Sequence, residues 1–139
     1  MNPPFITVEN IAKSFYTEEK TIEVLRGISL VIEAGEKVAI LGSSGAGKST
    51  FLHLLGTLDK PTRGKIIINQ VNVADLSSTP LAKFRNQTIG FMFQFHHLLP
   101  EFSALENVAM PALIAGIHRA EALGRSEELL RKVNLQQRL

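Results

Sequence analysis

A short glycine-rich motif constrains this chain more than any other feature. Residues 42–50 read G-S-S-G-A-G-K-S-T, and an apolar run at residues 38–41 comes directly before them. The spacing G-x-x-x-x-G-K-[ST] after a strand is typical of a P-loop, whose glycines let backbone N–H groups point at phosphate oxygens. Lys48 adds a positive charge, the Ser49 hydroxyl can ligate Mg²⁺, and the following helix attracts anions at its N-terminus. The motif therefore predicts a nucleotide site, in preference to an ordinary Gly/Ser-rich turn.

Length and composition exclude several other classes of protein. The chain has 139 residues, which predicts one domain or part of one, and its net charge of +2 is too small to argue for nucleic acid. It has no cysteine, so disulfides and thiolate metal sites are excluded. No secretory signal is present at the N-terminus, and the longest uncharged apolar stretch, residues 108–117, is too short for a bilayer span. We expect a soluble, intracellular chain that reaches a membrane only through a partner.

Periodicity along the chain predicts strands first, then the P-loop unit, then helices. The predicted strands are residues 7–12, 23–26, 29–33, 37–41, 65–68, 71–73 and 88–93. The predicted helices are a segment with Phe51, Leu54, Leu55 and Leu58 on one face, and residues 79–85, 103–117 and 119–133. Residues 29–33 and 37–41 are expected to form a hairpin whose second strand leads into the P-loop, and Asn69-Gln70 is expected at a tight turn.

Three segments, in this order, resemble the ATP-binding subunits of ABC transporters. They read L-R-G-I-S-L-V-I-E-A-G-E-K-V-A-I-L-G-S-S-G-A-G-K-S-T, G-K-I-I-I-N and I-G-F-M-F-Q. The stretch F-H-H-L-L-P-E-F-S-A-L-E-N-V-A-M-P at residues 95–111 is most similar to the lipoprotein-releasing (Lol-type) subfamily; the macrolide-export and cell-division types match less of it. The resemblance implies an α/β P-loop NTPase, with residues 1–94 as the β subdomain and P-loop core. Residues 95–139 would be the Q-loop and the start of the helical subdomain.

The resemblance also implies roles for individual residues. Lys48 and Gln94 correspond to catalytic positions, and Ser49 and Gln94 to Mg²⁺ ligands. An amide oxygen suits Gln94, because it can ligate a hard cation and accept a hydrogen bond from water. Phe15 matches the aromatic residue that stacks on adenine, with Tyr16 beside it as the alternative. The residues implied to hold the ATP phosphates are Gly42, Ser43, Ser44, Gly45, Ala46, Gly47, Lys48, Ser49 and Thr50.

The chain departs from the family pattern in two places. Asn69-Gln70 stands where Asn-Gly is usual, and a positive φ at a residue other than glycine costs roughly 1 kcal/mol. The L-S-G-G-Q signature, the Walker B Asp and Glu and the switch histidine are missing, and no four-residue apolar run is followed by Asp-Glu. We therefore expect a sequence that is truncated at its C-terminus and that does not hydrolyse ATP by itself.

The partners follow from the same resemblance. It implies ATP with Mg²⁺, a homodimer of ATPases in the full-length form, and attachment to permease subunits on the cytoplasmic face of a bacterial inner membrane, where lipoproteins are released. The residues expected to dock on the permease are Phe95, His96, His97, Leu98, Leu99 and Phe102. The alternatives are a nucleotide-binding remnant without turnover, a related macrolide-export or cell-division ATPase, and another P-loop class such as a kinase or GTPase.

Two further groups of polar residues are weak candidates for chemistry. His96 and His97 are adjacent, so on an extended segment their side chains point to opposite sides and chelate a metal poorly. Glu101 and Glu106 could form a carboxylate pair, but the resemblance puts both away from the γ-phosphate. We expect a surface or partner-contact role for the histidines and no catalytic role for the two glutamates.

Overall fold

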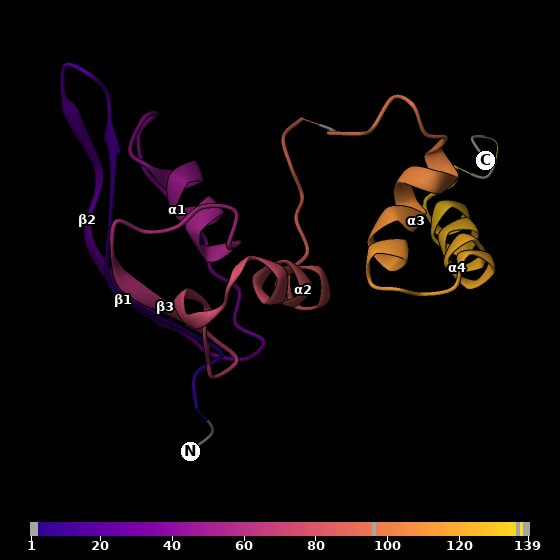
Figure 1. The fold of residues 1–139 in the computed structure, drawn as a ribbon, viewed down its shortest axis with the longest axis horizontal. Helices are drawn as coiled ribbons and strands as arrows, with labels where there is room; N and C mark the ends of the chain where they lie inside the picture. The colour runs from indigo at the N-terminus through magenta and orange to yellow at the C-terminus, as the bar shows by residue number, and fades with distance from the viewer. Residues whose placement is uncertain (1–2, 96, 136, 138–139) are drawn as a thin grey trace. The chain divides into compact units, whose positions relative to one another are not determined.

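A computed structural model describes residues 3–95, 97–135 and 137. The chain forms two compact units, Met1–Ala82 and Lys83–Leu139 (Figure 1). The division falls inside α2 (Ser78–Thr88). The assignment of residues 1–94 and 95–139 to two subdomains stays a prediction.

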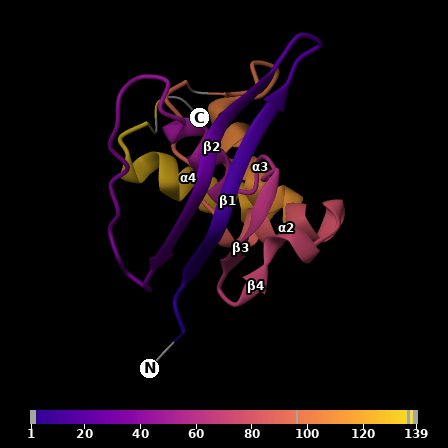
Figure 2. The ribbon, with the colours of Figure 1, turned by 90° about the vertical axis from the view of Figure 1, so that its left-hand side faces the viewer.

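The first unit is built on a four-stranded antiparallel sheet with the order β2-β1-β3-β4 (Figure 2). Its strands are β1 (Ile6–Tyr16), β2 (Thr21–Ile32), β3 (Arg63–Ile68) and β4 (Val71–Asn72). The strands predicted at residues 23–26 and 29–33 are one strand, because β2 pairs with β1 from Ile32 opposite Ile6 to Thr21 opposite Tyr16. The pairing of β1 with β2 contains register shifts of the kind that β-bulges produce, and no turn divides β2.

Gly64 lets β3 approach β1 closely. It has a φ of 86°, and a Cβ there would lie 2.4 Å from the Asn10 carbonyl oxygen and 2.5 Å from that of Glu9. Any other residue would push the two strands apart. The buried residues of this unit's core are Val8, Ile11, Ala12, Leu25, Phe51, Leu54, Ile66, Ile68 and Val73.

The helix predicted after the glycine-rich motif is α1 (Lys48–Leu55), and Figure 1 shows it beside the sheet in the same unit. Phe51 and Leu54 are buried, as the periodicity predicts. The helix ends sooner than predicted, because Gly56 is its C-cap and donates its N–H to the Leu52 carbonyl. Leu58 therefore lies beyond the helix and is exposed.

Two predicted strands are wrong. Residues 37–41 form no strand, so the expected hairpin with residues 29–33 does not exist, and the Leu41 side chain is 89% exposed. Residues 88–93 form none either: α2 continues to Thr88, and Met92 is fully exposed. An apolar segment becomes a strand only when a neighbouring strand completes its hydrogen bonds, and the described part of the chain pairs none with these two.

The tight turn predicted at Asn69-Gln70 is confirmed. Both residues are left-handed, with φ of 47° and 66°, and they join β3 to β4 as a two-residue hairpin turn. Gln70 adopts this conformation without being glycine, at a cost of roughly 1 kcal/mol. A single 3₁₀ turn, η1 (Val73–Asp75), follows, and the Asn72 side chain accepts a hydrogen bond from the Ala74 N–H at its start.

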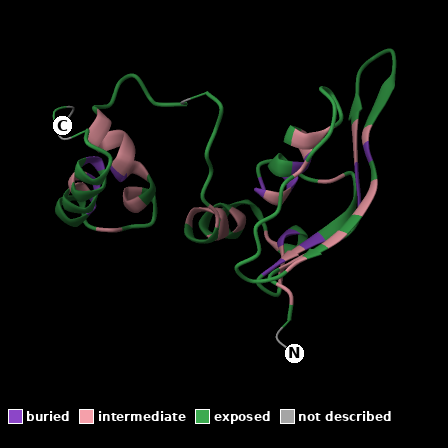
Figure 3. Ribbon diagram, turned by 180° about the vertical axis from the view of Figure 1, so that it is seen from behind, coloured by how far each residue is buried: buried purple, intermediate pink, exposed green. Residues whose placement is uncertain are grey.

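The second unit contains two paired helices, α3 (Ala104–Ile114) and α4 (Arg119–Lys132), close to the predicted 103–117 and 119–133. Ala109, Ala122, Ser126 and Leu130 are buried, most of α3 is half-buried, and the rest of α4 is largely exposed (Figure 3). Small residues at Ala109 and Ala122 let helices pack closely. None of the helices in the described part of the chain has the length and apolar character needed to cross a membrane.

Candidate functional site

The glycine-rich motif forms a tight loop that ends at the first residue of α1. Gly45 and Gly47 are left-handed, with φ of 78° and 90°, and the Ala46 N–H donates to the Ser43 carbonyl across the loop. Gly47 is the N-cap of α1 and has no side chain to cap the helix. The first amides of any α-helix lack partners within the helix, so this end of α1 can receive an acceptor from outside.

Lys48 folds back over the loop that precedes it. Its Nζ donates to the carbonyl oxygens of Gly42, at 2.9 Å, and Ser43, at 2.6 Å. These contacts put the positive charge of Lys48 at the carbonyls that open the loop, close to the N-terminus of α1. An anion at this place would meet an ammonium group and helix-end amides together.

Gly47 holds the loop against β2. A Cβ at this position would lie 2.8 Å from Leu25 Cδ2 and 3.1 Å from Val24 Cγ1, so only glycine allows the loop to approach the strand this closely. Gly45 has a similar φ but nothing within 4 Å of its notional Cβ. The two glycines therefore serve different purposes: Gly47 gives close approach and Gly45 gives conformation alone.

The residues of the loop fit a phosphate group of a nucleotide. Ser43, Ser44 and Ser49 are exposed, Thr50 is half-buried, and the Lys48 ammonium lies among the loop's own carbonyls. Exposed hydroxyls, an ammonium group and helix-end amides are the donors that phosphate oxygens accept from. The Ser49 hydroxyl is also a hard oxygen ligand of the type that Mg²⁺ takes.

Gln94 belongs to the second unit, whereas Ser49 belongs to the first. Its side chain is exposed, in an irregular segment that follows two stacked rings, Phe91 and Phe93, with centroids 5.2 Å apart. Its role as a ligand remains a prediction. Among the described residues, no group of three His, Cys, Asp or Glu side chains could hold a metal ion.

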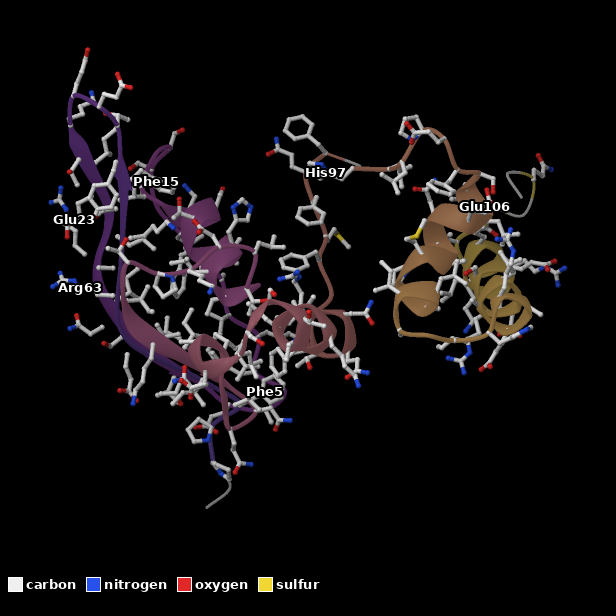
Figure 4. The ribbon with its side chains drawn as sticks, in the orientation of Figure 1. Phe5, Phe15, Glu23, Arg63, His97 and Glu106 are labelled. Atoms are coloured by element: carbon white, nitrogen blue, oxygen red, sulfur yellow. The ribbon has the colours of Figure 1, made fainter. Side chains whose placement is uncertain are left out.

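Phe15 lies on β1 of the first unit and is 43% exposed, while Tyr16 is 71% exposed at the end of the same strand (Figure 4). The Lys13 Nζ lies 5.0 Å from the centroid of the Phe15 ring. Lys13 also donates to Asp59 Oδ2 at 2.7 Å and to the Lys60 carbonyl at 2.8 Å. Lys13 was not predicted as a functional residue, because its only signal in the sequence is its place two residues before Phe15.

Asp59 is held in its charged form by these contacts. Burial by itself would raise the pKa of the Asp59 carboxyl group. Hydrogen bonds from the Lys13 ammonium and the Lys60 N–H, with the positive charge of Lys13, outweigh burial and keep that pKa below its usual value. Lys13 and Asp59 therefore form a charged pair between β1 and the segment that follows α1.

The segment predicted to dock on a permease is exposed within the second unit. Phe95 and Leu98 are 70% and 62% exposed, and Leu99 and Phe102 are 44% and 42% exposed. The His97 ring makes an edge contact with Phe93, with centroids 4.9 Å apart, and His96 lies outside the described residues.

Two polar residues of α3 shape the end of this segment. The Asn107 amide donates to the carbonyls of Leu99, Phe102 and Ser103 and accepts from the Leu99 N–H. Glu106 forms a capping box with Ser103, so it has a structural partner at the start of α3. The S-x-x-E spacing in the sequence could have predicted the capping box. No local sequence pattern predicts the hydrogen bonds from Asn107 to the backbone of Leu99, Phe102 and Ser103.

Comparison with known proteins gives consistent results. A family model described as "ABC transporter" matches residues 25–139. The chain is 56% identical over 134 residues to the "Lipoprotein-releasing system ATP-binding protein LolD" of Syntrophus aciditrophicus (strain SB), covering 96% of this chain and 60% of that protein. Its identity to the protein of the same name from Myxococcus xanthus (strain DK1622) is 52%, with the same coverage. The chain thus spans about 60% of the length of these curated relatives.

Solved structures agree with the sequence matches. A dimeric structure of the ATP-binding cassette MJ0796 bound to ADP and Pi has a TM-score of 0.83 and 38% identity, and covers 91% of this chain and 56% of its own. The predicted fold class, an α/β P-loop NTPase of the ABC-type ATPase core, is confirmed. Since the family model also covers most of the residues, the chain belongs to the ABC transporter family.

Proposed function

We propose that this chain is the phosphate-binding part of an ABC transporter ATPase and binds ATP with Mg²⁺ through Gly42 to Thr50. The observation that carries the proposal is the position of the Lys48 ammonium, over the loop and next to the N-terminus of α1. Its relatives are named ATP-binding proteins, and the similar cassette MJ0796 has been solved with ADP and phosphate.

Each residue of the loop would make a different contact with the nucleotide. Lys48 exchanges its two loop carbonyls for phosphate oxygens, which are stronger acceptors because they are charged. The amides at the start of α1 and the hydroxyls of Ser43 and Ser44 supply further donors. Ser49 and Gln94 are the proposed Mg²⁺ ligands, and Phe15 is the proposed stacking partner of the base. Bound Mg²⁺ neutralises phosphate charge during phosphoryl transfer.

We further propose that the substrate of the whole protein is lipoproteins, which it helps to release from a bacterial inner membrane. The support is identity of 50% or more to lipoprotein-releasing ATP-binding proteins over nearly the full chain. In the full-length form it would act as a homodimer on the cytoplasmic face. Phe95, His97, Leu98, Leu99 and Phe102, with His96, would contact the permease subunits.

The binding of ATP can be tested by calorimetry or with a fluorescent nucleotide. Lys48→Ala removes a charge-assisted contact and should weaken ATP binding by about 1.5–3 kcal/mol, roughly tenfold to a hundredfold. Lys37→Ala is the matched control, because Lys37 is an exposed lysine outside the loop and loses the same charge. Equal affinity of wild type and Lys48→Ala would contradict the proposal.

A further inference from the structure

The Lys13 ammonium group lies over one face of the Phe15 ring, 5.0 Å from the ring centroid. We propose that Lys13 is a positioning residue for the nucleotide base: its ammonium group fixes the Phe15 ring from one side and leaves the other side for the base. This inference rests on the proposed function, since it assumes that ATP binds at the loop of residues 42–50.

Lys13 is restrained far more than a surface lysine. Its side chain is 12% exposed, and its Nζ contacts Asp59 Oδ2, the Lys60 carbonyl and the face of Phe15. An ammonium group has three N–H donors, so two hydrogen bonds and a cation–π contact use its capacity fully. The Lys13 ammonium group is therefore held in one position, and its contact with the Phe15 ring restrains the ring as well.

The partners of Lys13 link β1 to the helix of the phosphate loop. Asp59 and Lys60 lie on the segment that follows α1, the helix that Lys48 begins. Thr62, on the same segment, donates its N–H to the Ala12 carbonyl and accepts at its Oγ1 from the Ser14 N–H. The segment is thus attached to β1 on both sides of Lys13, and the Phe15 ring has a fixed relation to α1.

The phosphate loop reaches the same hairpin from the other strand. Gly47 packs against Val24 and Leu25 of β2, and Leu25 pairs directly with Lys13 across the sheet. Phe15 is two residues further along β1 and keeps 43% of its surface exposed. A ligand with anionic phosphates at one end and a flat aromatic base at the other suits this arrangement, because stacking on an aromatic side chain stabilises a base.

The test separates recognition of the base from recognition of the phosphates. Binding of ATP and of inorganic triphosphate, both with Mg²⁺, is measured for wild type, Lys13→Met, Lys13→Arg and Asp59→Asn. Lys13→Met keeps the length of the side chain but removes the charge, and should weaken ATP binding about three- to tenfold. Triphosphate binding should change less than about twofold, because the triphosphate has no base to stack. Lys13→Arg should restore most of the affinity for ATP, and Asp59→Asn should weaken it less than Lys13→Met.

Lys20→Met is the matched control, since Lys20 is exposed at the turn between β1 and β2. It should leave both affinities unchanged. In addition, the ring-proton chemical shifts of Phe15 should move in ligand-free Lys13→Met and stay in place in Lys20→Met.

Three results would overturn the inference. If wild type binds ATP and Lys13→Met binds it equally well, Lys13 does not position the base, although the proposed function stands. If Lys13→Met weakens the binding of ATP and of triphosphate by the same factor, Lys13 has only a structural role. If Lys13→Met does not fold, the same comparison of the two affinities is made with Asp59→Asn. If wild type binds no ATP, the proposed function and this inference both fail.

Discussion

The Asn107 side chain and the Leu99 backbone exchange two hydrogen bonds. The Leu99 N–H donates to Asn107 Oδ1 at 2.9 Å, and Asn107 Nδ2 donates to the Leu99 carbonyl at 3.0 Å. One side chain of α3 thus fixes the backbone that presents the exposed Leu98 and Leu99 side chains.

Asn107→Ala should therefore loosen the turn before α3. The Leu99 N–H loses its acceptor, so its hydrogen exchange should accelerate by about the factor that corresponds to 1 kcal/mol, roughly fivefold. Asn107→Asp keeps an acceptor for this N–H and loses the donors to the three carbonyls, so it should protect the Leu99 amide better than Asn107→Ala. The same exchange rate at Leu99 in wild type and Asn107→Ala would show that the bracing is unimportant.

Gly47→Ala should destabilise the first unit more than Gly45→Ala. Both changes force alanine into a left-handed conformation, at about 1 kcal/mol each, but only the methyl group at position 47 would meet Leu25 and Val24. Crowding of this kind lowers the free energy of unfolding by about a further 1–3 kcal/mol. Urea unfolding followed by circular dichroism measures the difference, and equal midpoints for the two variants would refute the contact with β2.

The start of α3 should depend on pH through Glu106. Hydrogen bonds from the Ser103 N–H and hydroxyl group, with the nearby Arg119 guanidinium, hold the pKa of Glu106 below its usual value. The ionised carboxylate therefore stabilises the fold above the ordinary pKa of about 4.3, and this contribution is lost as the pH falls through the lowered pKa. Glu106→Gln should abolish this part of the pH dependence, which exchange of the α3 amides between pH 3 and 6 would reveal. Identical pH profiles would contradict it.

The exposed leucines of the second unit should be needed for assembly with a permease. In a full-length protein containing this sequence, together with its membrane subunits, Leu98→Ala with Leu99→Ala should abolish complex formation and leave ATP affinity intact. Leu129→Ala is the control, because Leu129 is a leucine of α4 that is 52% exposed. Pull-down and nucleotide binding are measured separately, and undiminished assembly of the double variant would sink the docking proposal.

A polypeptide of residues 1–139 should bind ATP without turning it over, and should unfold over a broad temperature range. Its sequence has no apolar run followed by Asp-Glu, and Leu41 and Met92 are almost or fully exposed. A small buried core leaves little free energy beyond the cost of ordering the chain. Phosphate release and a thermal melt check both points. Hydrolysis above a Lys48→Ala control, or a sharp melt, would prove the expectation wrong.

The sequence by itself determined the parts that depend on neighbours along the chain. The G-x-x-x-x-G-K-S pattern indicated a tight glycine-rich loop before α1, the spacing of Phe51 and Leu54 gave the buried face of that helix, and Asn69-Gln70 marked the turn between β3 and β4. Each rests on backbone conformation or on side-chain periodicity within a few residues.

Only the tertiary structure decided what depends on distant partners. The apolar run at residues 38–41 suggests a strand, yet it forms none, because strand formation requires hydrogen bonds from another strand that local pattern does not supply. Lys13 and Asn107 show the same limit. Lys13 meets Asp59 across 46 positions of sequence because β1 and the segment after α1 are brought together, and Asn107 reaches back to Leu99 because α3 starts with a cap. Such contacts depend on how the helices and strands pack, and the sequence by itself does not show which distant residues will be paired.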